Sequence, residues 1–309
     1  MQKNIFLLGP TASGKTELAK SLYDDFPLEI ISVDSAQIYK GLDIGTAKLS
    51  GDDQEKYPHH LIDCKAPCER YSVNEFRMDV EKISTKIYKS DKVPLLVGGT
   101  MMYFNALEHP LDEMPESSDE VREKVREELE RYGLVYLYEK LSQVDPDIVK
   151  KIKPTDTQRI LRALEVYYIS GNPISSYHQV GTRHEAKYNS LKIALLPKDR
   201  VILNSRIEAR VSSMIKSGLI EEVELLIKGN PELDLTYPAL RCVGYKQVYE
   251  CLTGVSPIKE LNEKIIIATR QLAKRQMTWI RGMENLLLID PFNAMELKSV
   301  IGRVKKFLN

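Results

Sequence analysis

Cysteine, tryptophan and net charge are all scarce in this sequence of 309 residues. It has four cysteines, one tryptophan, and 44 acidic residues against 44 basic ones. So few cysteines exclude a disulfide-stapled scaffold, and Cys64 and Cys68 have no nearby second pair that would complete a four-ligand metal site. The zero net charge argues against a broadly cationic surface. It does not exclude a nucleic-acid partner, because recognition depends on where the charges lie.

Long hydrophobic runs are also missing. The N-terminal apolar run, Ile5 to Leu8, is too short for the core of a signal peptide, and no run approaches the roughly 18 residues that a membrane-spanning helix needs. Hydrophobic residues make up 43% of the chain and charged residues 28%, which is ordinary for a globular protein. We therefore expect a soluble, cytoplasmic protein that makes no membrane contact and acts as a monomer.

Short apolar runs alternate with helical patterns over the first hundred residues. The runs at 4–8, 29–33 and 93–97 are bounded by turn residues, which predicts buried strands. Residues 16–23 and 73–89 carry apolar side chains at helical spacing. This alternation predicts an α/β fold with a parallel sheet covered by helices on both faces.

The middle of the chain reads differently. Residues 112–130 hold nine acids and three bases, helical patterns follow at 136–152 and 157–170, and 171–190 has a loop composition. The next strand is expected at 191–196, with further helices over 198–217, 219–228 and 263–279. The sequence thus predicts an α/β core made of 1–110 and 191–309, interrupted by an all-helical insertion at 111–190.

The residues directly after the first strand match a phosphate-binding pattern, a glycine, four residues and then Gly-Lys-Ser/Thr. They are Gly9, Pro10, Thr11, Ala12, Ser13, Gly14, Lys15 and Thr16. Glycines let the backbone wrap an anion with its N–H groups, the following helix N-terminus favours negative charge, and the lysine reaches the outer phosphates. The Thr16 hydroxyl can bind Mg²⁺. The pattern predicts a phosphate or diphosphate ligand without saying which molecule carries it.

An acid at the end of the second strand is the next candidate. The segment that reads guanine in switch GTPases is missing, and the third strand ends in Gly98, Gly99 and Thr100 without a carboxylate. Asp34, which ends the second strand, should lie at the carboxyl edge of the sheet, where ligands of such folds bind. It is a candidate metal-holding acid or general base, with a helix cap as the alternative.

Basic residues gather on two predicted helices. Arg206 and Arg210 are four residues apart and share a helix face, so they can clamp a diphosphate. Residues 264–283 hold five bases and no acid, which suits a polyanion. Both features are also compatible with ordinary solvated helix faces.

Six segments together resemble the tRNA dimethylallyltransferase family. They are the phosphate loop at 9–16, Ser-Val-Asp-Ser-Ala-Gln-Ile-Tyr at 32–39, Asp-Ile-Gly-Thr-Ala-Lys at 43–48, Val-Gly-Gly-Thr-Met-Met-Tyr at 97–103, Arg-Cys-Val-Gly-Tyr-Lys-Gln at 241–247 and Thr-Arg-Gln-Leu-Ala-Lys-Arg-Gln at 269–276. The resemblance runs from residue 4 to about residue 282. It implies a P-loop NTPase-like fold. No Cys/His zinc-finger extension follows, so the bacterial type is expected.

The resemblance implies transfer of a dimethylallyl group from dimethylallyl diphosphate to N6 of adenosine 37, beside the tRNA anticodon. The phosphate loop would then hold the leaving diphosphate, and Lys15, Arg210 and a Mg²⁺ ion on Thr16 would neutralise its charge. By the same resemblance, Thr100 belongs to the reaction centre, and Asp34 accepts the N6 proton. The adenine must leave the stack of the anticodon loop to reach this site.

The resemblance also implies which residues contact the tRNA. Gln37 has both a donor and an acceptor for a base edge. Arg122 is a further contact, although it lies in the acidic stretch. The implied contact residues are Asp34, Ser35, Ala36, Gln37, Arg122, Gln158, Arg159, Ile160, Leu161, Arg162, Arg241, Cys242, Val243, Gly244, Tyr245 and Lys246.

Three alternatives remain open at this point. A small-molecule or nucleotide kinase shares the phosphate loop and the sheet, but it leaves the basic C-terminal helix without a role. An isopentenyltransferase that acts on free adenine nucleotides should have a smaller helical insertion. A non-enzymatic RNA-binding NTPase switch is disfavoured by the missing guanine-reading segment.

Overall fold

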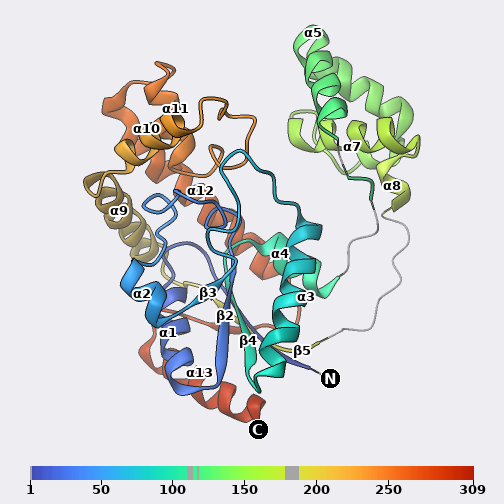
Figure 1. Ribbon diagram of the computed structural model, residues 1–309. Coiled ribbons are helices and arrows are strands. Elements are labelled where there is room, and N and C mark those ends of the chain that lie inside the picture. Colours follow the sequence, from blue (N-terminus) through green and yellow to red (C-terminus); the bar gives the residue numbers. More distant parts are fainter. Residues whose placement is uncertain (1, 110–113, 117, 178–187) are drawn as a thin grey trace. The chain divides into compact units, whose positions relative to one another are not determined.

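The computed structural model describes residues 2–109, 114–116, 118–177 and 188–309. It forms two units, a core unit of Met1–Glu108 with Ala186–Asn309 and a helical unit of His109–Glu185 (Figure 1). The expected boundary at 110–111, and residues 178–187 of the expected loop, lie outside the described residues. Each unit has a hydrophobic core of its own, so each is described by itself.

The core unit is built on a six-stranded sheet in which every neighbouring pair is parallel. Its order is β3-β2-β4-β1-β5-β6. The strands are β1 (Lys3–Leu8), β2 (Leu28–Val33), β3 (His59–His60), β4 (Val93–Gly98), β5 (Asn189–Leu195) and β6 (Leu287–Ile289). The predicted α/β fold with a parallel sheet is confirmed. The strands β3 and β6 were not predicted, because two or three residues are too few to show a periodic pattern.

Alternate residues of the strands face opposite sides of the sheet, and each side is covered by helices (Figure 1). Phe6 and Leu8 pack with α3 (Val73–Lys89) and α4 (Met101–Glu108). Ile5 and Leu7 pack with α1 (Lys15–Asp25) and α13 (Ala294–Leu308). The central strands are therefore buried on both faces, which is why they read as continuous apolar runs.

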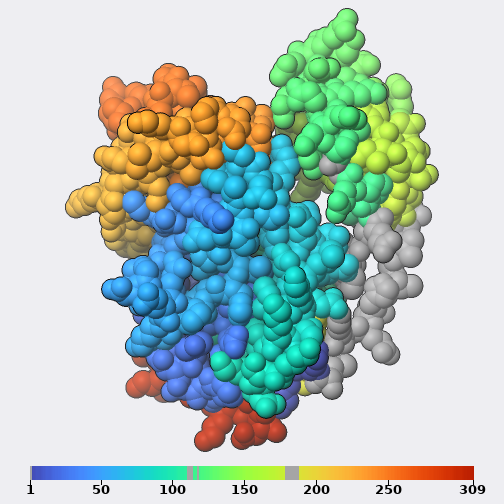
Figure 2. Space-filling model, viewed as in Figure 1, coloured from blue at the N-terminus to red at the C-terminus, as the bar shows by residue number. Residues whose placement is uncertain are grey.

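The C-terminal helices of the core unit form a further core against the segment that follows β2. Ile38, Tyr39 and Leu42 of that segment are buried among them. These helices are α9 (Arg200–Lys216), α10 (Leu219–Gly229), α11 (Tyr245–Leu252) and α12 (Leu261–Gly282), and a 3-10 turn at Ile258–Glu260 precedes α12. A short helix, α2 (Gly51–Lys56), follows the buried segment in the chain. In Figure 2 the first hundred residues (blue to teal) fill the middle of this unit's visible face. No helix among the described residues is long and apolar enough to cross a membrane.

The helical unit contains α5 (Asp119–Val144), α6 (Pro146–Val149), α7 (Thr157–Ser170) and α8 (Ile174–Tyr177). Within α5, Gly133 has a non-helical backbone (φ 79°, ψ 168°) that breaks the helix in two. The predicted helix over 136–152 is wrong at its end, because the chain turns at Asp145 and Pro146 starts a new helix. Part of the expected loop is also helical, as α8.

Asp145 ties the turns of the helical unit together. Its side chain is buried, Oδ1 accepts from the Ile148 N–H at 3.0 Å, and Oδ2 accepts from the Ser175 N–H at 2.9 Å. One carboxylate thus caps α6 and holds the start of α8.

We expect Asp145→Ala to destabilise the helical unit by about 2–4 kcal/mol, because two buried N–H groups lose their acceptor. Hydrogen–deuterium exchange across 145–177 in the full chain measures the loss. Asp147→Asn is the control, because Asp147 lies in the same short helix but is exposed, and it forms an ion pair with Lys150, which is also exposed. Equal protection of the Asp145→Ala variant and the wild type would contradict this account.

Candidate active site

A cavity of about 510 Å³ lies at the carboxyl edge of the sheet. Because β2, β4 and β1 are consecutive neighbours, the loops that leave their carboxyl ends meet there. The lining comes from these loops and from the C-terminal helices: Thr11, Lys15, Thr16, Asp34, Ser35, Ala36, Gln37, Gly45, Thr46, Ala47, Gly99, Thr100, Arg210, Val211, Met214, Pro238, Arg241, Cys242, Val243, Gly244, Ile265, Thr269, Leu272, Arg275 and Gln276. The three candidates predicted for the reaction, Asp34, Thr100 and Arg210, all line this one cavity.

The phosphate loop joins β1 to α1 as its sequence predicts. Lys15 Nζ donates to the carbonyl oxygens of Gly9 (2.9 Å) and Pro10 (2.8 Å), so the loop wraps its own lysine. Burial, and after it the charge of Arg210, lower the pKa of Lys15 to about 7, although Asp34 acts in the opposite direction. A group that is only partly protonated near neutral pH is well placed to gain charge when an anion arrives.

The two arginines of α9 have different positions. Arg210 lines the cavity, and burial lowers the pKa of its guanidinium while the nearby Asp34 raises it. Arg206 instead donates from Nε to the Ala12 carbonyl at 2.9 Å, so it supports the phosphate loop from outside. The predicted pair therefore splits into one cation in the cavity and one that braces the loop.

Asp34 lies in a turn that its own side chain stabilises. Its Oδ1 accepts from the Ala36 N–H at 2.9 Å, which fixes the carboxylate at the cavity wall. Thr100 is tied to the same turn, because its Oγ1 accepts from the Ser35 N–H at 3.0 Å. The ends of β2 and β4 thus hold a carboxylate and a hydroxyl in one place.

Gly98 explains why β4 can end so close to β2. A Cβ at this position would lie 1.9 Å from the Val33 carbonyl oxygen, so no larger residue fits. Two residues on, the Thr100 N–H donates to the same oxygen at 3.2 Å. The glycine therefore serves the placement of Thr100.

Gln276 of α12 belongs to the site, although sequence analysis assigned it no chemical role beyond its place in the family-like segment 269–276. Its Oε1 accepts from the Thr11 N–H at 2.9 Å, and its Nε2 donates to the Gly99 carbonyl at 2.8 Å. One amide thus connects the phosphate loop to the Gly-Gly turn.

The segments 34–37 and 241–244, predicted to contact tRNA, both line the cavity. Gln37 was expected to offer a donor and an acceptor to a base edge, and in the structure both are already in use: Oε1 accepts from Ser32 Oγ (3.2 Å) and Nε2 donates to the Thr46 carbonyl (3.3 Å). The Tyr245 side chain is fully buried. Lys246 is exposed and lies 3.6 Å from Glu250.

The other predicted tRNA contacts belong to the helical unit, so their positions are given within that unit only. Arg122 pairs with Asp119 at 2.9 Å, and Arg159 lies 3.5 Å from Asp156. Arg162 donates to the Pro115 carbonyl at 2.9 Å. The same segment contains Gln158, Ile160 and Leu161, and the Ile160 side chain is fully buried in the unit's core.

Two features bear on the chemistry the cavity allows. Among the described residues no group of three or more histidine, cysteine or acidic side chains is arranged to hold a metal ion. The oxygen donors on the cavity wall include Thr16 and Asp34, which suits a Mg²⁺ ion that takes most of its ligands from phosphate and water.

The Cys242 thiol also lines the cavity. Burial, and after it the carboxylate of Asp34, raise the pKa of this thiol to about 12.

Comparison with known proteins gives the family. The family model described as IPP transferase matches residues 37–283. The tRNA dimethylallyltransferase of Legionella pneumophila strain Corby is 46% identical over 100% of this chain and 98% of its own.

Solved structures with a similar fold belong to enzymes of the same kind. The tRNA isopentenylpyrophosphate transferase of Bacillus halodurans has a TM-score of 0.73 at 31% identity, covering 100% of this chain and 97% of that one. A eukaryotic dimethylallyltransferase acting on tRNA has a TM-score of 0.80 at 26% identity, and the match covers 100% of this chain and 80% of that one. With a family model over most of its length and relatives that match it from end to end, the chain belongs to the IPP transferase family.

Proposed function

We propose that this protein transfers the dimethylallyl group of dimethylallyl diphosphate to N6 of adenosine 37 in the anticodon loop of tRNA. The observation that carries the proposal is the single cavity that joins the phosphate loop to Asp34, Thr100 and Arg210 in a chain of this family. The names of its relatives, tRNA dimethylallyltransferase and dimethylallyltransferase acting on tRNA, support the reaction class. We further propose that the enzyme works as a monomer in the cytoplasm.

The diphosphate is the leaving group in this reaction, and the cavity's cations suit it. As the bond between allylic carbon 1 and oxygen breaks, negative charge grows on the diphosphate, and Lys15 and Arg210 neutralise it. Backbone N–H groups of the phosphate loop hold the same anion. A Mg²⁺ ion, with Thr16 as its protein ligand, would supply further charge neutralisation to the diphosphate.

The acceptor is the exocyclic N6 amine of adenosine, which attacks carbon 1. N6 loses a proton as its new bond forms, and the Asp34 carboxylate takes it. The turn that fixes Asp34 Oδ1 on the Ala36 N–H keeps the carboxylate aimed at the amine. The Thr100 hydroxyl accepts from the Ser35 N–H, and when its own hydrogen turns away from Ser35 Oγ (3.3 Å) it donates to the leaving oxygen. To reach this site the base must flip out of the anticodon loop.

The helical unit is proposed to bind the tRNA, with Arg122, Gln158, Arg159 and Arg162 as contacts. It carries the exposed Arg159 in the first turn of α7, where phosphate binding is favourable. The segment 241–246 of the core unit contacts the tRNA beside the cavity.

The direct test uses unmodified tRNA, labelled dimethylallyl diphosphate and Mg²⁺. We expect label on adenosine 37, and no label on free adenine nucleotides, because the protein has a large helical unit for a macromolecular acceptor. Mapping the modified nucleoside by mass spectrometry gives the position. ATP turnover without label on tRNA would contradict the proposal and favour a kinase.

We expect Asp34→Asn to lower kcat by about 10²- to 10⁴-fold while tRNA affinity stays unchanged. The asparagine oxygen still accepts from the Ala36 N–H, so the turn remains, but the amide is not a base. Single-turnover kinetics with saturating tRNA measures the rate. Asp25→Asn, on the exposed end of α1, is the control. A wild-type rate in Asp34→Asn would rule out the proton transfer to Asp34.

Lys15 makes diphosphate binding pH-dependent. With its pKa lowered to about 7, free protein loses the Lys15 charge as pH rises above that value, and binding an anion restores it with uptake of one proton. The affinity for dimethylallyl diphosphate should therefore fall by up to about tenfold per pH unit above the pKa. Calorimetry at pH 8 in two buffers of different ionisation enthalpy measures the proton uptake.

Lys15→Arg is the control for that measurement. Its guanidinium stays charged at every pH used, so proton uptake in this variant reports only the titration of the ligand itself. Proton uptake equal in the two proteins would show that Lys15 is already charged before binding, contrary to the expectation.

A further inference from the structure

Residues 43–48 form one wall of the cavity without belonging to a helix or strand. Gly45, Thr46 and Ala47 line the cavity. We name residues 43–48 the neutral wall, because the three of them that line the cavity carry no charge. Such a lining suits an uncharged base better than a diphosphate. Since no element of the sheet holds the segment, other side chains must fix its position.

Glu222 of α10 holds the first half of the neutral wall. Its Oε2 accepts from the N–H groups of Asp43 (3.2 Å) and Ile44 (2.7 Å), and its Oε1 accepts from the Gly45 N–H (3.3 Å). Three successive backbone N–H groups thus converge on one carboxylate. Such a nest forms strong, charge-assisted hydrogen bonds with an anion.

Tyr245 completes this anchor. Its hydroxyl donates to Glu222 Oε1 and accepts from the Gly45 N–H at 3.1 Å. Burial raises the pKa of Tyr245, and the hydrogen bond to Glu222 raises it further, so the hydroxyl remains a donor. A Cβ on Gly45 would lie 2.4 Å from the tyrosine ring, which means that the wall packs directly on it.

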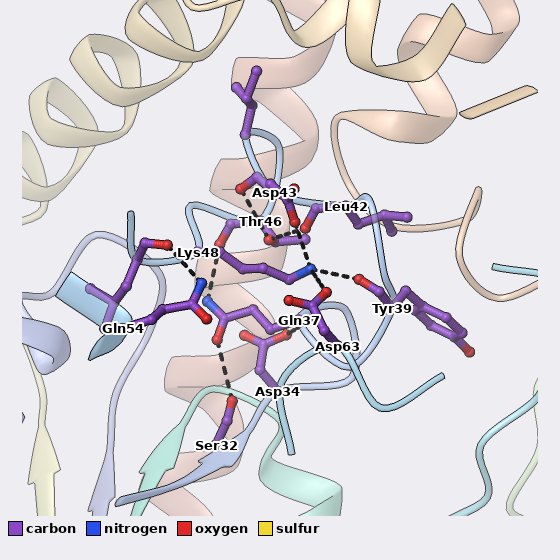
Figure 3. Close-up of polar contacts among 12 residues, drawn as sticks. Ser32, Asp34, Gln37, Tyr39, Leu42, Asp43, Thr46, Lys48, Gln54 and Asp63 are labelled. Atoms are coloured by element: carbon purple, nitrogen blue, oxygen red, sulfur yellow. Dashed lines mark hydrogen bonds and ion pairs between the residues drawn. The ribbon is translucent and has the colours of Figure 1, made fainter. Parts of the chain in front are cut away.

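Lys48 holds the other end of the neutral wall. Its Nζ donates to the Tyr39 carbonyl (2.6 Å), Asp43 Oδ1 (2.8 Å) and Asp63 Oδ1 (2.5 Å), as Figure 3 shows. The Lys48 side chain is only 1% exposed, so its charge is used inside the fold and not in the cavity.

The wall is also joined to the turn that carries Asp34. The Thr46 carbonyl accepts from Gln37 Nε2, and Gln37 in turn accepts from Ser32, with Asp34 beside them in Figure 3. By contrast, within the part of the chain that the structure describes, no hydrogen bond connects residues 43–48 to the phosphate loop. The position of the wall therefore bears on the base and its proton acceptor, and not on the diphosphate.

We propose that Glu222 is a positioning residue for the acceptor nucleotide. Through the nest of N–H groups it sets the neutral wall, and so aligns the flipped base with Asp34 before the reaction. This inference rests on the proposed function. Glu222 itself does not line the cavity, so it acts through the wall.

Glu222→Gln tests the inference, because glutamine keeps the shape but replaces one accepting oxygen with an N–H donor that faces other donors. We expect KM for tRNA to rise by about tenfold, which corresponds to losing one or two hydrogen bonds to a charged group. KM for dimethylallyl diphosphate and its calorimetric affinity should stay as in the wild type. A purely structural defect would weaken both substrates.

Glu221→Gln is the matched control. Glu221 is the exposed neighbour in the same first turn of α10, so this variant loses the same charge from the same helix N-terminus. It should behave as the wild type. Tyr245→Phe is the milder companion, because the three N–H groups keep their carboxylate, and we expect a smaller rise in KM for tRNA alone.

Three outcomes would overturn the inference. They are an unchanged KM for tRNA in folded Glu222→Gln, an equal rise for both substrates, and, if Glu222→Gln does not fold, an unchanged KM for tRNA in Tyr245→Phe. Failure of the wild type and Glu221→Gln to modify tRNA would instead overturn the proposed function, so the two failures can be told apart.

Discussion

The parallel order β2-β4-β1 is the constraint on which the rest of the site depends. It brings the ends of three consecutive strands to one edge, each followed by a different chemical group. A phosphate loop follows β1, a hydroxyl follows β4 and a carboxylate follows β2. Gly98 makes the arrangement tight, because only a residue without a side chain lets β4 pass the Val33 carbonyl. The chemistry of the cavity is thus a direct product of sheet topology.

The C-terminal helices complete what the sheet edge begins. Arg210 supplies a second cation, Arg206 braces the phosphate loop, and Gln276 links that loop to the Gly-Gly turn. The contacts of Arg206 and Gln276 join residues that are far apart in the chain, and they end on backbone groups. These two helix residues therefore hold loop backbone in place, while the loops carry Asp34 and Thr100 and α9 carries Arg210.

The local parts of this site could be predicted from the sequence, and the long-range parts could not. The phosphate loop has a fixed spacing with a physical cause, and Asp34 ends a strand whose apolar run is clear. Gln276 and Glu222 have no such local signature, because their importance lies in contacts with residues about 180 to 270 positions away in sequence. The break of the expected helix at Pro146 was readable in principle, since proline at N1 starts a helix and Asp145 caps it.

Cys242 has a consequence for side reactions. An allylic diphosphate, the proposed donor, presents an electrophilic carbon, and any strong nucleophile on the cavity wall would compete with the intended amine. A thiolate is such a nucleophile, whereas a protonated thiol is a poor one. Because burial and the nearby Asp34 raise the pKa of Cys242 to about 12, its sulfur remains protonated at neutral pH. The carboxylate that we propose as the proton acceptor would thus also help to keep this neighbouring thiol from being alkylated.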